Sequence, residues 1–322
     1  MNTECCSERL FFSLLRSALW GTPVRIDEPV DAAVWADLLQ LAKRHAVQGI
    51  LYDAIKELPP DAGMPRGQVA EWLLEVDRIE RFNARMRAVI DVQRKVWQRY
   101  GIEAILLKGI TVAAMYPVPE HRICGDIDWW LPDNDSWQRS VDVVRNNKIA
   151  VSFDSDGDAY YELNGVVVEH HHKGLKWPGT VGELLMLNTH ILHHAAVTGI
   201  GMRHICDLAM GCKYFKGKYA DSEYEQALRK LGLLRWTDLL HNTLRRVMDI
   251  PEEYLPVLPG ARPVPDKDVD KFVRLVMTDG NFGMDRAQRY SGFFLRAGLF
   301  LKYAPWAFIG RWLRLIIGRT FR

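Results

Sequence analysis

Residues 124–131 read CGDIDWWL and place two aspartates, Asp126 and Asp128, one residue apart in an otherwise apolar stretch. The stretch predicts a β-strand, on which side chains two positions apart point to the same face. Both carboxylates would then project together, while Ile127 and Trp129 face the opposite way. Two like charges this close repel each other, and Mg²⁺, which prefers carboxylate oxygens, is the usual ion between them. A solvent-exposed pair or a helix cap gives the same short pattern, so the surrounding sequence has to decide between these interpretations.

A third acidic residue follows further along the chain. VVVEHHH (166–172) alternates so that Glu169 and His171 share one face. If this strand lies in one sheet with the two aspartates, Glu169 can supply a third carboxylate. His171 can orient a carboxylate or approach an acceptor, whereas His170 and His172 point to the other face and are expected to be structural.

A turn that precedes the aspartates carries a lysine and a glycine. IEAILL (102–107) predicts a short strand, Lys108 and Gly109 end it, and ITVAAMY (110–116) predicts a short helix. Free backbone N–H groups at such a turn, together with the helix dipole, favour an anion such as a triphosphate. Lys108 adds a positive charge, and Thr111 offers a hydroxyl. A turn without any binding function can have the same sequence, so the prediction of phosphate binding here depends on the three acidic residues that follow.

The hydrophobic pattern divides the chain into three parts. Residues 1–100 repeat apolar residues at helical spacing and form a helical N-terminal segment, and residues 101–175 alternate strands with short helices in a small core. Residues 176–322 return to helical patterns that a proline-rich linker interrupts. The pair Asn164-Gly165 predicts a tight hairpin turn inside the core. We therefore expect an α+β fold, with a small mixed sheet flanked by helical segments on both sides in sequence.

Composition limits the class of protein. The 322 residues are 48% hydrophobic and 25% charged, which is typical of a globular chain that can bury a core. The five cysteines show no CxxC spacing, which argues against a disulfide framework or a four-cysteine zinc site and favours a reducing compartment. We find neither a signal-like N-terminus nor a run of about 18 apolar residues, so we expect a cytoplasmic protein.

The net charge of +2 is unevenly distributed. Residues 286–322 contain eight Arg or Lys and no Asp or Glu, so residues 1–285 carry 34 basic and 40 acidic side chains. A uniformly basic surface for nucleic acid is therefore not expected. The tail interleaves arginines with aromatic and aliphatic residues, which fits peripheral contact with a membrane. A terminal helix that packs on its own domain gives the same pattern, and this is the interpretation that we favour.

These motifs together resemble a known family. LLKG, then GDIDWW, then VVVEHH is similar to the polymerase-β-like nucleotidyltransferase superfamily, in which a strand and a glycine turn precede an acid-hydrophobic-acid strand and a third acid. More narrowly, LLKGITVAAMYP, HRICGDIDWWLP and LNTHILHHAAVTGIGMRHICDLAM resemble a bacterial family of uncharacterised nucleotidyltransferases over residues 105–215. The resemblance implies a nucleotidyltransferase core in which Asp126, Asp128 and Glu169 are catalytic and bind Mg²⁺.

The resemblance also implies a reaction. In-line displacement with two metal ions would move a nucleoside monophosphate, with AMP as the first expectation, from a nucleoside triphosphate such as ATP to a hydroxyl acceptor and release pyrophosphate. Lys108 and Gly109 would hold the nucleotide phosphates, with Thr111 as a candidate hydroxyl contact, and Arg122 would either stabilise the phosphates or pair with the acids. The acceptor stays open among small molecules, sugars, proteins and nucleic-acid ends. The alternative function is a nucleotide-binding or partner-binding module that keeps the fold with impaired chemistry.

Two further motifs lie in the helical C-terminal part. In NTHILHH, His190 and His194 lie one helical turn apart, a spacing that can bind zinc, but the HExxH pattern of metalloproteases requires glutamate where Ile191 stands. A zinc site is therefore not expected there. Arg203 and Asp207 also lie four residues apart and are expected to form a salt bridge. The family resemblance includes this pair, which leaves a supporting role near the active site open.

Overall fold

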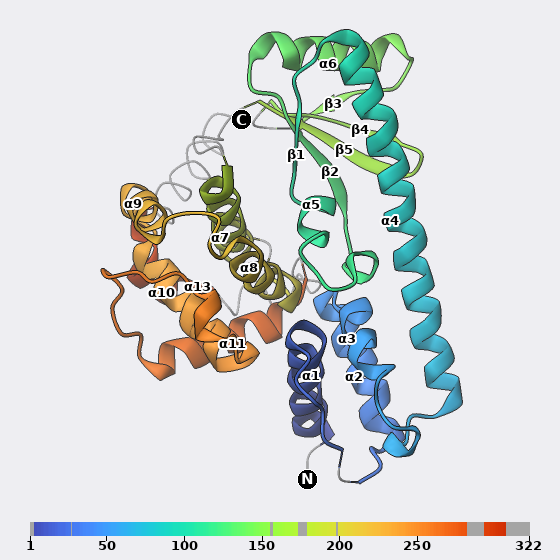
Figure 1. The fold of residues 1–322 in the computed structure, drawn as a ribbon, viewed down its shortest axis with the longest axis vertical. Helices are drawn as coiled ribbons and strands as arrows, with labels where there is room; N and C mark the ends of the chain where they lie inside the picture. Colours follow the sequence, from blue (N-terminus) through green and yellow to red (C-terminus); the bar gives the residue numbers. More distant parts are fainter. Residues whose placement is uncertain are drawn as a thin grey trace. The chain divides into compact units, whose positions relative to one another are not determined.

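The computed structural model describes residues 3–26, 28–154, 157–172, 179–197, 199–281 and 293–306. The chain forms two compact units, which are coloured along the sequence in Figure 1. Unit 1 consists of Met1–Arg25, Ala33–Val47 and Lys176–Arg322, and unit 2 consists of Ile26–Ala32 and Gln48–Leu175. The division into residues 1–100, 101–175 and 176–322 stays a prediction about folding units.

Unit 2 contains the sheet and the long helix that follows the N-terminal part. Its helices are α3 (Gln48–Ile55), α4 (Arg66–Tyr100), α5 (Ile110–Ala113) and α6 (Asn134–Asn146), with 3₁₀ turns η1 (Pro60–Ala62) and η2 (Pro119–His121). Its strands are β1 (Ile105–Leu107), β2 (Asp126–Trp130), β3 (Ser152–Phe153), β4 (Ala159–Leu163) and β5 (Val166–His171).

The strands form one five-stranded sheet in the order β1-β2-β5-β4-β3. β2 and β5 pair in parallel, whereas β1 with β2, β4 with β5 and β3 with β4 pair antiparallel. The hairpin between β4 and β5 turns at Asn164 and Gly165, both of which have positive φ, as the Asn-Gly pair predicts. The expected α+β fold with a mixed sheet and flanking helices is confirmed.

Local sequence explains where the two long helices of unit 2 begin and end. α4 starts directly after Pro65 and ends at Gly101, whose φ of 60° continues the chain in the left-handed conformation that glycine tolerates. α6 starts where the Asp133 carboxylate accepts a hydrogen bond from the Ser136 backbone N–H at 2.7 Å, an N-cap.

One face of the sheet is covered by α4 and α6, which lie along it in Figure 1. The alternation of β2 and β5 places Ile127, Trp129 and Val168 in this core, and these side chains are at most 2% exposed. The apolar cluster also takes in side chains of α4 and α6: Met86, Val89, Ile90, Trp97, Val143 and Val144. The opposite face of the same strands is therefore the one left for Asp126, Asp128, Glu169 and His171.

A chain of hydrogen bonds runs through the buried face of the sheet. The Trp129 indole N–H donates to Gln93 Oε1 at 2.9 Å, and Gln93 Nε2 donates to the Tyr161 hydroxyl at 2.6 Å. The Tyr161 hydroxyl lies 3.0 Å from His170 Nε2, and Ser140 Oγ lies 2.9 Å from His170 Nδ1. Burial lowers the pKa of His170 to about 3, so the ring is neutral and can accept one of these bonds. As predicted, His170 is structural.

Tyr161→Phe is expected to destabilise the protein by about 1–3 kcal/mol, because it removes the one hydroxyl that joins Gln93 to His170 and leaves buried polar groups unsatisfied. Urea unfolding measures this free energy. Tyr160→Phe is the matched control, since Tyr160 lies on the same strand with 43% of its surface exposed. Equal stabilities of the two variants would show that the buried chain of hydrogen bonds contributes nothing to folding.

Unit 1 is helical in its described residues. It contains α1 (Thr3–Trp20), α2 (Ala32–His45), α7 (Gly179–Val197), α8 (Met202–Phe215), α9 (Asp221–Leu231), α10 (Leu234–Thr243), the π-helical segment η3 (Leu244–Met248), the 3₁₀ turn η4 (Glu252–Tyr254), α11 (Asp266–Asp279) and α13 (Phe293–Tyr303). α1 contacts η3, where the Trp20 indole N–H donates to the Met248 carbonyl at 2.7 Å.

The pattern at 34–55 reads as one continuous helix, but the structure divides it into α2 and α3. Ala46 adopts a φ of 55°, and the chain turns there without a glycine or proline to mark the break. The end of α2 is closed by a Schellman motif, in which Val47 N–H donates to the Ala42 carbonyl at 3.0 Å and Ala46 N–H to the Lys43 carbonyl at 3.1 Å. The Asn281 backbone N–H adds a tertiary hydrogen bond to the Arg44 carbonyl at 2.7 Å. Local propensity is overridden here, which the sequence alone does not reveal.

The basic tail is described only over residues 293–306, where α13 packs on unit 1. Phe300 is fully buried with its ring centroid 5.6 Å from that of Trp236, and the Tyr303 hydroxyl donates to Asp268 Oδ2 at 2.7 Å. These contacts agree with the favoured packing interpretation for this stretch. The remaining part of the tail prediction, at 286–292 and 307–322, lies outside the described residues.

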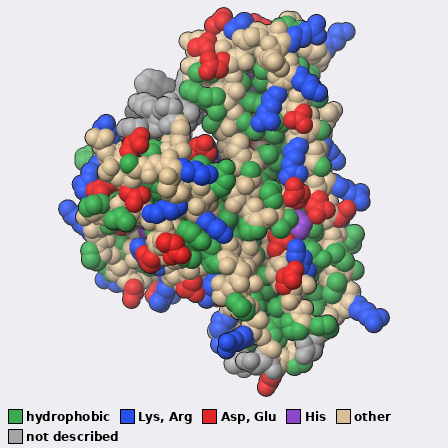
Figure 2. Space-filling view, viewed as in Figure 1, with side chains coloured by type: hydrophobic (Ala, Val, Ile, Leu, Met, Phe, Trp, Pro, Cys, Tyr) green, Lys and Arg blue, Asp and Glu red, His purple; other side chains and the backbone are tan. Residues whose placement is uncertain are grey.

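Two observations on the described residues concern contact with membranes and with charged partners. Among the described residues, no helix combines the length and apolar character needed to cross a bilayer. On the face drawn in Figure 2, acidic and basic side chains are interspersed.

Candidate active site

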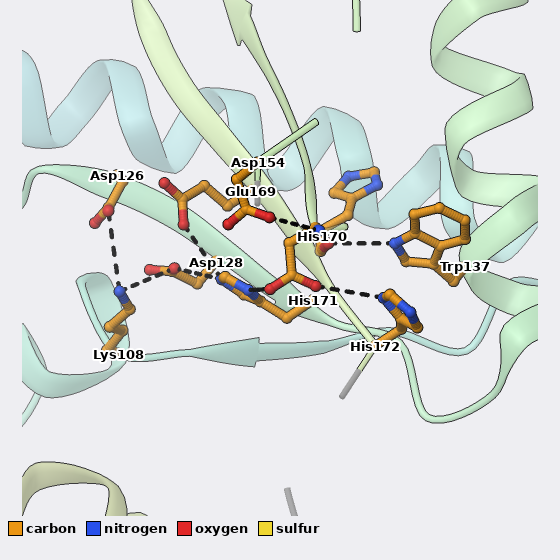
Figure 3. Close-up of polar contacts among 10 residues, drawn as sticks. Lys108, Asp126, Asp128, Trp137, Asp154, Glu169, His170, His171 and His172 are labelled. Carbon is orange, nitrogen blue, oxygen red and sulfur yellow. Dashed lines mark hydrogen bonds and ion pairs between the residues drawn. The ribbon is translucent and has the colours of Figure 1, made fainter. Parts of the chain in front are cut away.

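The register of the two parallel strands brings the acids together. Asp128 on β2 pairs with Glu169 on β5, and Asp126 pairs with Val167 two residues earlier on each strand. Because residues two apart on a strand share a face, Asp126, Asp128 and Glu169 all lie on the face opposite to the α4 and α6 core. Figure 3 shows their carboxylates gathered beside Lys108 and His171.

Asp128 is the centre of this group. It is fully buried, and its Oδ1 lies 3.0 Å from Lys108 Nζ and 2.9 Å from His171 Nε2. Its Oδ2 is also buried and has no hydrogen-bond partner among the described residues. A buried carboxylate oxygen without a partner carries a desolvation cost that a bound cation would remove.

The lysine of the turn bridges the two aspartates. Lys108 Nζ lies 3.9 Å from Asp126 Oδ2 as well as 3.0 Å from Asp128, and the Lys108 side chain is 26% exposed. Burial alone would lower the pKa of Lys108, but the neighbouring Asp128 and Asp126 carboxylates outweigh it and raise the pKa above its ordinary value. The ammonium therefore stays charged and partly neutralises the pair.

His171 joins the site more closely than its strand position alone suggests. Besides Asp128, its Nε2 lies 3.4 Å from Glu169 Oε2, and its Nδ1 lies 2.8 Å from Asp158 Oδ2. Burial opposes the charged ring, but the hydrogen bonds to these three carboxylates raise the pKa of His171 to about 10. His171 is thus an imidazolium at neutral pH and donates from both ring nitrogens.

Asp158 was not predicted from the sequence. It lies just before β4, and its backbone N–H donates to Asp154 Oδ1 at 2.9 Å, which holds the loop against the strand end. From there Asp158 reaches both His171 and His172, the latter with 3.3 Å between Oδ1 and Nδ1. The sequence DSDGD (154–158) lacks the alternation of a strand, so it does not predict toward which face of the sheet Asp158 points. No sequence signal distinguishes Asp158 from its neighbours.

The Lys108-Gly109 turn is formed by a close approach of two backbones. Gly109 has φ 61° and ψ −113°, and an added Cβ there would lie 3.1 Å from the Asp126 carbonyl oxygen. Only glycine fits this conformation without strain. The Thr111 hydroxyl donates to the Lys108 carbonyl at 3.0 Å, and Arg122 Nη1 donates to the Gly109 carbonyl at 3.3 Å. Both side chains therefore stabilise the turn, and their contact with nucleotide phosphates stays a prediction.

The helix after this turn is too short for its dipole to contribute much to the electrostatic potential at the turn. α5 spans only Ile110–Ala113, a single turn in which few peptide dipoles align. An anion at this turn would depend on the Lys108 charge and on nearby backbone N–H groups rather than on a helix macrodipole.

A divalent cation fits the donor set of this site. Asp128 and Glu169 each offer a carboxylate oxygen, and these lie within 4.8 Å of each other and of a His171 ring nitrogen. His171 donates to both carboxylates, so it could join them as a ligand only after losing a proton. Asp126 adds a further carboxylate oxygen near Lys108. Carboxylate oxygens are the donors that Mg²⁺ prefers, and the unpartnered Asp128 Oδ2 provides a buried oxygen for it.

The predicted supporting pair lies elsewhere in the chain. Arg203 and Asp207 are both on α8 in unit 1 and are 6% and 5% exposed. Their salt bridge and their role beside the acids stay predictions, whereas His171 is placed directly against Asp128 and Glu169.

Comparison with known proteins finds a family for part of the chain. Residues 31–180 match the model of a family described as an uncharacterised nucleotidyltransferase. The predicted resemblance to a nucleotidyltransferase family is confirmed over this range, whereas its third motif (187–210) lies outside the match and the bacterial origin of the family stays a prediction. The match contains all the acids of the site, together with the Lys108-Gly109 turn. No curated protein and no solved structure matches the chain. The similarity of residues 31–180 to this family supports nucleotidyl transfer in general. The nucleotide, the metal and the acceptor have to be inferred from the residues of the site.

Proposed function

We propose that this nucleotidyltransferase segment moves a nucleoside monophosphate, AMP in the first instance, from a nucleoside triphosphate to a hydroxyl acceptor and releases pyrophosphate. The observation that carries the proposal is the pairing of Asp128 with Glu169 across parallel strands, beside Asp126 and with a buried carboxylate oxygen left unpartnered among the described residues. Such a convergence of acids on one sheet face costs free energy unless a cation is present.

In this proposal Asp126, Asp128 and Glu169 hold divalent metal, with Mg²⁺ as the expected ion, and His171 supports them. When bound, the metal supplies charge neutralisation on the phosphates and a lower pKa for the attacking hydroxyl. The chain's own contribution is to hold the carboxylates in one register, which requires no reorganisation at the moment of reaction.

The Lys108-Gly109 turn would hold the nucleotide phosphates. The Lys108 ammonium already lies at the edge of the carboxylate group, so a small shift of its side chain carries it from the aspartates to a phosphate oxygen. Gly109 lets the backbone approach closely, while Thr111 and Arg122 keep the turn in place.

The contacts of His171 limit its role. Its Nε2 points at Asp128 and Glu169 and its Nδ1 at Asp158, so neither nitrogen is left to take the proton of an acceptor hydroxyl. We therefore assign it the orientation of Asp128 and Glu169, with Asp158 anchoring its other nitrogen.

One observation favours the alternative of a nucleotide-binding module with impaired chemistry. Lys108 and His171 already place two cations against the carboxylates, as a protein without metal would require. Against this, the four carboxylates of Asp126, Asp128, Asp158 and Glu169 outnumber the two cations, so the group keeps a formal excess of negative charge.

The deciding experiment uses the full chain with α-labelled nucleoside triphosphates, with and without Mg²⁺, and a panel of sugars, small hydroxylated molecules, nucleic-acid ends and proteins. We expect Mg²⁺-dependent binding of a triphosphate, with release of pyrophosphate and label transfer to one acceptor class. Tight triphosphate binding with no transfer to any class would favour the impaired module. Absence of triphosphate binding with and without Mg²⁺ would contradict both functions.

A further inference from the structure

A second group of metal-binding side chains lies in unit 1. His190 and His194 project from α7 and His204 from α8, and one ring nitrogen from each lies within 4.8 Å of the others. The ring centroids of His190 and His194 are 4.3 Å apart, and each lies 5.4 Å from that of His204. The sequence shows only the pair on α7, because the third ring comes from a different helix.

The packing of α7 on α8 holds the three rings at this spacing. Gly211 on α8 lies against Leu187 on α7 so closely that an added Cβ would meet Leu187 Cδ1 at 2.5 Å. His204 lies two helical turns before Gly211, and His194 lies two turns after Leu187, so the helices run antiparallel and the same close approach continues to the histidines. The rings are therefore positioned by a rigid helix pair rather than by a loop.

The surroundings of the rings suit a cation. His190 and His194 lie in the last two turns of α7, where the helix macrodipole gives a negative potential. Two carbonyl groups of this end already accept hydrogen bonds, that of His194 from the Gly199 N–H and that of Ala195 from the Arg296 guanidinium. His204 Nδ1 lies 3.4 Å from the Gly201 carbonyl, and a contact of this kind orients Nε2 of the ring as the ligand atom. His204 is 2% exposed, whereas His190 and His194 are half-buried, so the group opens toward solvent on one side.

We propose that His190, His194 and His204 bind a Zn²⁺ ion, with the fourth coordination position left for water or another ligand. Three imidazoles suit zinc and other late transition metals, whereas Mg²⁺ prefers the oxygen donors of the acidic site. Tetrahedral coordination places ring nitrogens about 3.3 Å apart. The three nitrogens lie within 4.8 Å of one another, and side-chain rotation on α7 can supply the adjustment that coordination requires. The ion would link α7 to α8 and add its binding free energy to the stability of unit 1.

The test titrates the metal-stripped full chain with Zn²⁺, and with Co²⁺ as a visible spectroscopic probe of tetrahedral coordination. We expect one tight Zn²⁺ site besides weaker binding at the acidic site, a Co²⁺ spectrum typical of tetrahedral geometry, and a rise in the thermal unfolding midpoint with Zn²⁺. His190→Gln and His194→Gln should each weaken Zn²⁺ binding more than about a hundredfold and remove the thermal shift. Both residues are half-buried, so these variants are expected to fold, which far-UV circular dichroism checks.

Two controls separate this site from other metal-binding groups. His193→Gln changes an exposed histidine beside His194 that is outside the converging set, and it should bind Zn²⁺ like the wild type. Asp128→Asn alters the acidic site, which also contains a histidine, and should remove only the weaker binding while leaving the tight Zn²⁺ site unchanged. The proposal is overturned if His190→Gln and His194→Gln bind Zn²⁺ like the wild type, or if Asp128→Asn removes the tight binding instead. The outcome is independent of nucleotidyl transfer, which needs no α7 histidine in the proposal above.

Discussion

Asp128→Asn is expected to lower the rate of pyrophosphate release by at least about a hundredfold, because it removes the charge at the centre of the acid group while keeping nearly the same volume. The carboxylate is fully buried and touches both Lys108 and His171, so no solvent-exposed group can replace it. The rate is measured with the nucleotide and acceptor that give the fastest transfer. Binding of Mn²⁺, followed by electron paramagnetic resonance, gives a second readout that needs no acceptor.

The matched control is Asp142→Asn, which makes the same change at an exposed position of α6. Asp126→Asn adds a variant whose folding is less at risk, since the Asp126 side chain is 37% exposed. Thermal unfolding of each variant shows that the fold is intact. Suppose that a folded Asp128→Asn protein transfers nucleotide at the native rate and binds Mn²⁺ with unchanged affinity. That outcome would contradict the assignment of the metal to these acidic residues.

Lys108→Ala is expected to change two affinities in opposite directions. Loss of the ammonium should weaken binding of nucleoside triphosphate by roughly ten- to a hundredfold, the range expected for a hydrogen bond between charged groups, with a smaller loss for the monophosphate. Binding of Mn²⁺ in the absence of nucleotide should become tighter, because Lys108 no longer competes for Asp128 and Asp126. Fluorescence titration of nucleotide and paramagnetic titration of Mn²⁺ measure the two effects.

The same variant should also lower stability when no metal is present, since Asp128 loses one of its two cationic neighbours in a buried setting. Mn²⁺ should restore part of that loss. Lys95→Ala, at an exposed position of α4, is the control for removal of a lysine charge. Equal losses for triphosphate and monophosphate, together with unchanged Mn²⁺ affinity, would indicate that Lys108 has a structural role only.

The acid face of the sheet could be predicted because strand alternation is a local property. The letters of β2 and β5 place Asp126, Asp128 and Glu169 on one face whatever surrounds them, and burial of Ile127 and Val168 opposite them then fixes which face is free. The alternation does not say which strands are neighbours. That Asp128 faces Glu169 directly is a result of the β2 and β5 register.

Contacts that depend on tertiary packing could not be predicted from the sequence. Asp158 reaches His171 from a loop, and His204 meets the α7 histidines from another helix. Ala46 ends α2 without any turn residue, and besides the local bonds of the helix end, the Arg44 carbonyl accepts a hydrogen bond from Asn281 far along the chain. These partners are distant in sequence, so a periodic pattern within a short window does not reveal them.

The discontinuity of unit 1 has a consequence for synthesis on the ribosome. α1 and α2 bury Phe11 and Trp35 completely, yet most of their unit lies in residues 176–322. At roughly 5–20 residues per second, these two helices wait on the order of ten seconds with their apolar faces uncovered, while the segments of unit 2 emerge in between. The nascent chain therefore completes the five-stranded sheet before unit 1, and α1 and α2 need protection from aggregation until residues 176–322 are synthesised.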